Sequence, residues 1–160
     1  MKPKKEEETP GVKIIARNKQ AFFQYEILSR LECGLQLAGT EVKSLREGNV
    51  NFSDSYAMVR DGELLLVGLN IAEYRMGNRF NHVAARTRKL LARKPEIRKL
   101  AAAIERKGLT LAPLAVYWKR GWAKVEIGVA RGKQLHDKRE TIRRREEDRE
   151  KGRVIRQFAR

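Results

Sequence analysis

The 160 residues suffice for one ordinary domain, and their 36 Lys and Arg against 20 Asp and Glu give a formal charge of +16. Such an excess repels itself in a compact fold, so we expect an anionic partner, above all nucleic acid; charge kept only for solubility is the alternative. The single cysteine, Cys33, excludes an intramolecular disulfide, and no apolar run approaches the roughly 20 residues that span a bilayer, so we expect a cytoplasmic protein without a membrane partner.

The first predicted elements follow a leader at residues 1–11. We expect this leader to be disordered because it mixes both charges with two prolines. Alternating side chains over residues 12–16 predict a weak strand, and Asn18 can cap a short helical turn after it. Residues 27–37 are expected to be extended.

A short helix is predicted at residues 39–48. Thr40 is its expected N-cap, and Val42 and Leu45, three positions apart, should point inward. Gly48 is a natural residue to end it, because glycine adopts the left-handed conformation that follows many helices.

Two β-hairpins are predicted further along the chain. The pair Asp61-Gly62 favours the type I′ turn that matches strand twist, and a second glycine-containing turn lies at residues 119–121. The strand pairs are 56–60 with 63–67 and 110–118 with 122–130. Apolar and polar residues alternate over 123–129, so one face of that strand should be buried and the other solvated.

A loop and a helix are predicted between the hairpins. Residues 76–89 should form the loop, because few of them are apolar and many are basic or hydrogen-bonding. The helix should carry Pro95 in its first turn and end at Gly108. From Ile97 onward its apolar residues fall at helical spacing, so one stripe should face the core.

These elements predict a mainly β fold with flanking α-helices, an OB-like small β-barrel that is partly open, over residues 12–130. Residues 131–160 differ, because they hold 12 Lys or Arg, 6 Asp or Glu and few apolar residues. We expect this basic C-terminal tail to be disordered when free, since it buries too little apolar area, and helical once phosphates screen its charge. A flexible solubilising tail is the alternative.

Catalysis is not expected. The two histidines, His82 and His136, lie in separate segments, whereas a ribonuclease-like acid–base pair needs both at one phosphate. Asp54, Asp61 and Glu63 can be read as a metal-dependent nuclease cluster, but turn and loop hydrogen bonding explains the first two better. Without a P-loop, a dinucleotide fingerprint or a zinc-binding helix motif, we predict no enzyme, no metal and no cofactor.

Binding chemistry is better represented. Seven cations occur within 14 residues, an arrangement that suits RNA phosphates better than a merely solvated helix face, because acidic partners are nearly missing there. They are Arg86, Arg88, Lys89, Arg93, Lys94, Arg98 and Lys99. Most aromatic residues are expected in the core, with Trp122 exposed beside its cationic turn. Glu32 can accept from base amino groups and so adds specificity.

Four stretches in order along the chain resemble one family. They are Gly39–Arg46 (GTEVKSLR), Asp54-Ser55-Tyr56, Arg86-x-Arg88-Lys89-Leu90-Leu91, and Gly132-Lys133 followed by His136-Asp137-Lys138-Arg139. Together they are similar to the SsrA-binding protein family, also called small protein B, the bacterial partner of transfer-messenger RNA. The resemblance covers nearly the whole chain from Val12 onward.

The resemblance implies a mechanism. Family members are OB-like barrels that bind the tRNA-like domain of transfer-messenger RNA and bring it, charged with alanine, to stalled ribosomes for trans-translation. The protein replaces an anticodon stem-loop, and its tail becomes helical in the vacant messenger channel. Elongation factor Tu escorts the complex, alanyl-tRNA synthetase charges the RNA, and the ribosome performs peptide transfer. We expect a monomer, with a general structured-RNA or ribosomal binding protein as the alternative function.

Matching motifs carry the family's site residues onto this chain. The set implied for transfer-messenger RNA is Asn18, Lys19, Glu32, Arg86, Arg88, Lys89 and Leu91. The set implied for the ribosomal decoding centre and messenger channel is Lys133, His136, Asp137, Lys138 and Arg139, to which we add the exposed Trp122 expected from the residue pattern. His136 is suited to stack on a ribosomal base.

Overall fold

The computed structural model describes residues 10–159, apart from the side chains of residues 135 and 136. The strands are β1 Val12–Arg17, β2 Tyr25–Leu35, β3 Val50–Asn51, β4 Tyr56–Arg60, β5 Glu63–Val67, β6 Asn70–Ile71, β7 Arg88–Leu91, β8 Thr110–Lys119 and β9 Trp122–Gly132. The helices are α1 Lys19–Gln24, α2 Gly39–Arg46, α3 Lys94–Lys107 and α4 Leu135–Phe158. Most of the predicted leader lies outside the described residues.

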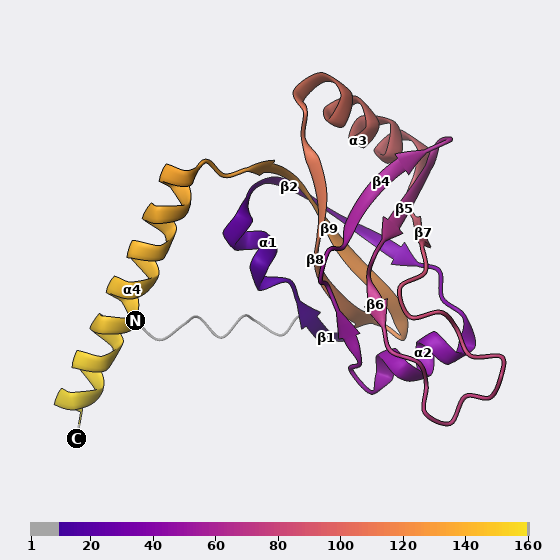
Figure 1. Cartoon of the computed structure of the whole chain (residues 1–160), viewed down its shortest axis with the longest axis horizontal. Helices are drawn as coiled ribbons and strands as arrows, with labels where there is room; N and C mark the ends of the chain where they lie inside the picture. Colours follow the sequence, from indigo (N-terminus) through magenta and orange to yellow (C-terminus); the bar gives the residue numbers. More distant parts are fainter. Residues whose placement is uncertain (1–9, 160) are drawn as a thin grey trace.

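Antiparallel pairing joins six strands into a closed circuit. In order they are β8, β4, β5, β7, β2 and β9, which returns to β8, while β1 pairs along β8 as an extra strand. The narrowest join is between β4 and β8, where Ala57 opposite Leu111 is the one paired position. The mainly β class with flanking helices is confirmed (Figure 1). The circuit is closed rather than partly open, and the OB-like description stays a prediction.

The core lies inside this circuit. Buried aliphatic side chains from β5, β7, β8 and β9 fill it, among them Leu64, Leu66, Leu90, Leu111 and Ile127. A second, smaller cluster lies outside the circuit, between α1 and the sheet, and consists of Ala21, Ala112, Leu114 and Ala130. This second cluster explains why Gly128, which the alternation placed on the solvated face of β9, is buried against Leu114, so that residues 127–130 are buried consecutively.

Both predicted hairpins are present. Asp61 and Gly62 have positive φ values of 52° and 74°, as a two-residue type I′ turn requires. Arg120 and Gly121 do the same at 50° and 82°. Lys119 pairs with Trp122, so the second turn has two residues rather than the three that the sequence predicted.

The helix starts follow local hydrogen bonds. α2 has Ala38 rather than Thr40 as its N-cap, because the Glu41 carboxylate accepts the Ala38 backbone N–H at 2.7 Å. In α3 the predicted stripe is confirmed, since Ile97 and Leu100 are buried and Gly108 ends the helix in the left-handed conformation. The strand β7 was missed, because it occupies four residues at the end of a basic segment that the sequence predicted to be a loop.

The C-terminal segment differs from the disorder expected for the free tail. It is a helix, α4, that runs beside α1 and away from the sheet (Figure 1). Between Gly132 and Gly152 no glycine or proline interrupts it, and two ion pairs at i,i+4 spacing line its surface, Arg143–Glu147 at 3.2 Å and Arg144–Glu140 at 2.7 Å. Good helix formers therefore give a helix here although little apolar area is buried.

Candidate nucleic-acid interface

A buried ion cluster around Glu41, in the first turn of α2, fixes the predicted basic motif. Its Oε1 accepts from Arg86 Nε and Arg88 Nε, both at 2.8 Å. Its Oε2 accepts from Arg86 Nη2 at 2.6 Å and from the Ala38 backbone N–H. Burial by itself would raise the pKa of Glu41, but the hydrogen bonds from Arg86 and Ala38 and the charge of Arg88 outweigh it and lower that pKa.

The position of Arg88 contradicts the expected contact with RNA. Its side chain has no exposed surface, and besides Glu41 its guanidinium donates to the backbone oxygens of Leu69, Arg86 and Ala84. A guanidinium whose hydrogen bonds are all made inside the protein cannot reach a phosphate. Arg88 therefore holds β7 and the preceding loop in place, whereas Arg86 keeps 37% of its side chain exposed.

Glu32 lies on the outer face of β2 and is held by two neighbours. Its Oε2 accepts from the Tyr117 hydroxyl at 2.6 Å, and Lys119 Nζ donates to both carboxylate oxygens at 3.2 Å. The hydrogen bond from Tyr117 lowers the pKa of Glu32, with smaller contributions from Lys119 and Lys124 and against partial burial. The carboxylate is thus ionised and fixed in direction, as an acceptor for base amino groups should be.

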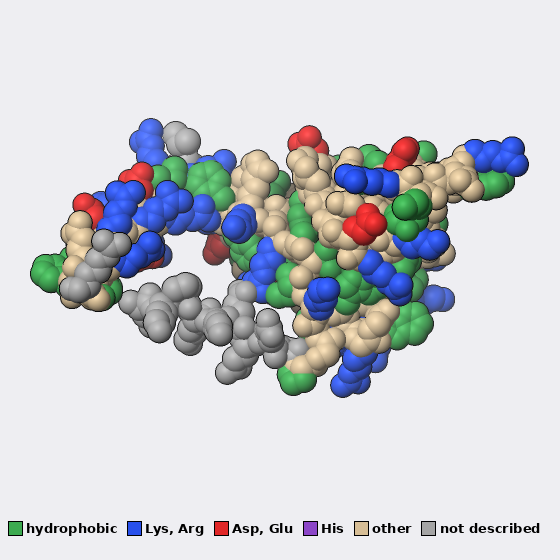
Figure 2. All heavy atoms as spheres, turned by 90° about the horizontal axis from the view of Figure 1, so that it is seen from below, with side chains coloured by type: hydrophobic (Ala, Val, Ile, Leu, Met, Phe, Trp, Pro, Cys, Tyr) green, Lys and Arg blue, Asp and Glu red, His purple; other side chains and the backbone are tan. Residues whose placement is uncertain are grey.

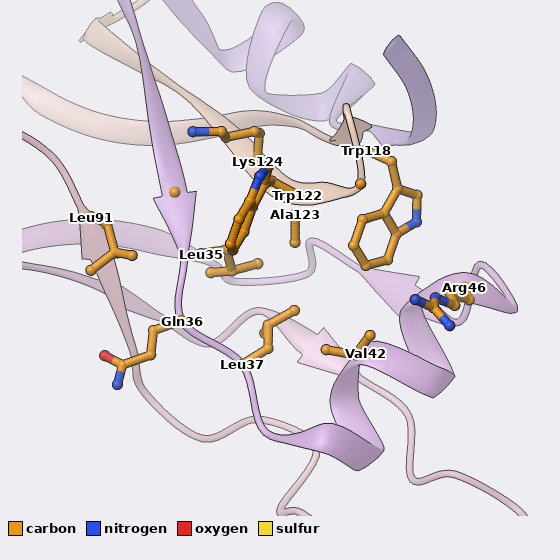
Figure 3. Close-up of a pocket in the computed structure, with 12 residues that line it drawn as sticks. Leu35, Gln36, Leu37, Val42, Arg46, Leu91, Trp118, Trp122, Ala123 and Lys124 are labelled. Carbon is orange, nitrogen blue, oxygen red and sulfur yellow. The ribbon is translucent and has the colours of Figure 1, made fainter. Parts of the chain in front are cut away.

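Leu91 and Trp122 line the same hollow, of about 450 Å³, at the end of the barrel near α2 (Figure 3). Both are exposed, Trp122 to 73% and Leu91 to 54%. The apolar floor of this hollow includes Leu35, Leu37 and Val42. The exposure predicted for Trp122 is confirmed.

Two basic side chains flank this hollow and were not singled out from the sequence. Arg46 lies 5.9 Å from the Trp118 ring, and Lys124 stands beside Trp122 (Figure 3). The signal for Lys124 was available, because it is a polar member of the alternating strand. An apolar floor with aromatic and cationic walls suits a nucleotide, whose base stacks while its phosphate is neutralised.

The remaining residues implied for transfer-messenger RNA divide between scaffold and surface. Asn18 caps α1 by accepting from the Ala21 N–H and donates to the Pro113 carbonyl at 2.9 Å, so its side chain serves the fold. Lys89 is half exposed and pairs with Glu63 at 2.8 Å. Lys19 is exposed at the start of α1.

Lys19 also lines a basic hollow of about 660 Å³ between α1 and α4. The other residues around it are Arg17, Phe22, Arg30, Arg145, Asp148 and Arg149. No sequence pattern indicates this group, because its members are up to 132 positions apart and only the packing of α4 on α1 brings them together.

The root of the tail is attached to α1 through Lys133. Its backbone N–H donates to the Gln24 carbonyl at 3.0 Å, and its Nζ donates to the Phe22 carbonyl at 3.1 Å and to Thr141 Oγ1 at 3.2 Å. Lys133 is thus an anchor of α4 in this conformation. Asp137 and Arg139 are exposed in the first turns of α4, Lys138 is half-buried, and the side chain of His136 lies outside the described residues.

Trp122 does not lie near the tail residues with which it was grouped for the ribosome. Trp122 begins β9 and Gly132 ends it, so an 11-residue strand, roughly 30 Å long, separates Trp122 from the root of the tail. Trp122 instead shares a hollow with Leu91. Blue side chains follow α4 and recur over the barrel in Figure 2, so both parts carry positive charge.

Two absences concern the described residues. Within residues 10–159 no group of three or more His, Cys, Asp or Glu side chains is placed to hold a metal ion. No helix in the same part of the chain is long and apolar enough to cross a membrane.

A mainly β body with an apolar and cationic hollow, followed by an exposed basic helix, defines a basic RNA-binding protein. Comparison of the chain with known proteins identifies the family within this class. The sequence profile described as SmpB protein matches residues 15–157. The SsrA-binding protein of Nostoc sp. is 49% identical over 153 residues, which cover 95% of this chain and 99% of that protein. That of Synechococcus elongatus is 52% identical over 146 residues, covering 91% and 95%.

A solved structure agrees with the sequence relatives. It is described as "tmRNA-SmpB: a journey to the center of the bacterial ribosome", and its matching chain is 49% identical with a TM-score of 0.64. The match covers 81% of this chain and 94% of that one. The chain belongs to the SmpB family.

Proposed function

We propose that this chain binds the tRNA-like domain of transfer-messenger RNA and delivers it to stalled ribosomes for trans-translation. The observation that carries this proposal is the match to the SmpB family across both body and tail, residues 15–157. The net charge of +16 supplies the attraction to phosphate that any RNA partner requires.

The body is the part that holds the RNA. Leu91 and Trp122 offer apolar surface to a nucleotide, Lys89 and Lys19 offer charge, and Glu32 offers a fixed acceptor. Arg88 and Asn18 act through the backbone that they position. Arg86, half exposed beside Glu41, both contacts the RNA and helps to hold the loop before β7 in place.

The tail is the part that binds the ribosome. Lys133, His136, Asp137, Lys138 and Arg139 address the decoding centre and the vacant messenger channel, which the basic α4 enters as a helix. The protein stands in for an anticodon stem-loop. Elongation factor Tu and alanyl-tRNA synthetase act on the same RNA, and this chain is a cytoplasmic monomer that performs no chemistry itself.

Competition binding tests the proposal. At physiological salt, labelled tRNA-like domain should remain bound in a large excess of bulk transfer RNA. Equal displacement by both RNAs would instead favour a general structured-RNA or ribosomal binding protein, because charge alone does not distinguish folded RNAs. Cleavage of the RNA during the assay would contradict the absence of catalysis.

A further inference from the structure

The loop between β6 and β7 carries three strongly exposed apolar side chains. Met76, Phe80 and Val83 are 81%, 80% and 70% accessible. In Figure 1 this loop projects beyond α2, and at the same end of the molecule Figure 2 shows a narrow projection with blue and green side chains at its tip. Side chains this exposed bury little apolar area in the fold, and Phe80 is the one among them that offers an aromatic face to a partner.

Hydrogen bonds nevertheless fix the base of the loop, residues 74 and 81–82, which we call its neck. Asn81 Nδ2 donates to the Tyr74 carbonyl at 2.8 Å, and Asn81 Oδ1 accepts the backbone N–H groups of Tyr74 and His82 at 3.3 and 3.1 Å. A Cβ at Gly77 would lie 2.5 Å from Asn81 Nδ2, so glycine is required for this close approach. The amide of Asn81 therefore closes residues 74–81 into a small ring.

The neck is in turn fixed to the barrel. One nitrogen of the buried His82 ring lies 2.9 Å from Thr40 Oγ1 on α2, and the other lies 2.8 Å from the Ile71 carbonyl on β6. The Ile71 N–H donates to the Ala84 carbonyl at 3.0 Å, and the cluster of Glu41 with its two arginines holds the end of the loop. The tip is thus presented on a fixed support, which lowers the entropy lost on binding.

The charge of the loop indicates an anionic partner. Residues 74–89 hold five Lys or Arg and no Asp or Glu, and Arg75 and Arg79 are exposed at the tip. The Arg79 guanidinium lies 5.1 Å from the centre of the Phe80 ring. An exposed aromatic face beside a planar cation is the combination that holds an unpaired base and its phosphate.

We propose that Phe80, with Arg79 beside it, is a stacking platform for an unpaired base of the RNA partner. This rests on the proposed function and goes beyond it by naming a contact outside the family-derived site residues. A protein partner would use Phe80 as an apolar contact and would not distinguish a π face from an aliphatic chain of similar size.

Four substitutions in the full-length protein separate stacking from apolar contact. Binding to the tRNA-like domain at physiological salt should weaken about 5- to 100-fold for Phe80→Ala and for Phe80→Leu, and stay within about twofold of wild type for Phe80→Tyr. Met76→Ala, which removes an equally exposed apolar chain from the same loop, is the matched control and should change affinity by less than about twofold. Chemical probing should find one unpaired nucleotide that wild type and Phe80→Tyr protect and Phe80→Ala leaves reactive.

The outcomes are distinct. Wild-type affinity for Phe80→Ala overturns the platform while leaving the proposed function intact. Retained binding by Phe80→Leu overturns stacking in favour of apolar contact. Loss of peptide tagging by Phe80→Ala with unchanged binding to free RNA also overturns the platform, and places the role of Phe80 on the ribosome. Failure of the wild type to bind this RNA selectively overturns the proposed function itself, and the platform with it.

Discussion

At the scale of single residues, Glu41 shows how one carboxylate supports a surface that it does not itself form. It is completely buried and receives four hydrogen bonds, three of them from Arg86 and Arg88. A buried ion pair contributes little net stability compared with apolar residues of the same shape, yet removing one partner leaves the other charge without compensation in the interior. The free energy of unfolding should therefore fall when one partner of the Glu41–Arg88 pair is removed.

Substituting Glu41→Ala should lower the free energy of unfolding by about 3–5 kcal/mol, because the guanidinium of Arg88 stays buried without a carboxylate. Urea denaturation at neutral pH measures this. The matched control is Glu63→Ala, which removes the exposed partner of Lys89 and should cost about 0–1 kcal/mol. Similar losses for both variants would show that Arg88 finds water or another partner.

The same carboxylate makes stability depend on pH. Because the folded state lowers the pKa of Glu41 below its ordinary value of 4.5, the unfolded chain takes up the proton first as the pH falls. Its contribution is therefore complete above pH 4.5 and is lost as the pH drops through the folded value. Between about pH 6 and pH 3 wild type should lose more stability than Glu41→Gln, as followed by denaturation at each pH. Parallel curves would rule out this contribution.

The sequence identified the basic motif but not the burial of its second arginine. Arg86, Arg88 and Lys89 look alike in a run of cations, and what sets them apart is the alternation of β7, which points Arg88 inward. Its acidic partner, Glu41, lies 47 positions earlier, in helix α2. Trp122, in contrast, was correctly predicted to be exposed, because it directly follows a glycine-containing turn rich in cations, which is a local signal.

At the scale of elements, the segments with local signals were predictable and those that depend on distant partners were not. The two hairpins and α3 follow from turn residues, a proline, a glycine and apolar spacing, all within the segment itself. Closure of the barrel depends on pairings such as Ala57 with Leu111, which no short window contains. The hollow between α1 and α4 was invisible for the same reason.

Helix α4 is the element in which local propensity and burial oppose each other. Its polar residues form a helix readily, and among the described residues Lys133 at its root and Arg145, 5.5 Å from the centre of the Phe23 ring, attach it to the body. Gly152 lies in its last turns, where glycine weakens a helix and an added Cβ would meet no atom within 4 Å.

Substituting Gly152→Ala should stabilise the end of α4 by roughly 0.5–1 kcal/mol, because alanine loses less backbone entropy in a helix. Slower amide hydrogen exchange over residues 149–158, with unchanged exchange in the barrel, is the expected result. Gly128→Ala is the contrasting change, since its Cβ would lie 2.9 Å from Leu114 Cδ1 and should destabilise the barrel. Unaltered exchange after Gly152→Ala would mean that the end of α4 is not helical in solution.

At the scale of the whole molecule, positive charge is divided between a folded body and an exposed helix. The hollow of Leu91 and Trp122 lies at one end of β9 and the root of α4 follows the other end, an arrangement consistent with the proposal that the two parts contact different RNAs. The sequence predicted this division from composition alone, since residues 131–160 are basic and poor in apolar residues. It could not predict that Lys133 attaches the helix to α1.

The division of labour is tested most directly by measuring RNA affinity and peptide tagging on the same two variants of the full-length protein. Lys138→Ala combined with Arg139→Ala should keep affinity for the tRNA-like domain within about threefold and abolish tagging on stalled ribosomes, because we propose that these side chains contact the ribosome and not this RNA. Leu91→Ala combined with Lys124→Ala should instead reduce the affinity at least about tenfold, and tagging with it. If the tail variant lost RNA affinity as severely as the body variant, body and tail would form one binding surface for the same RNA, contrary to the proposed division.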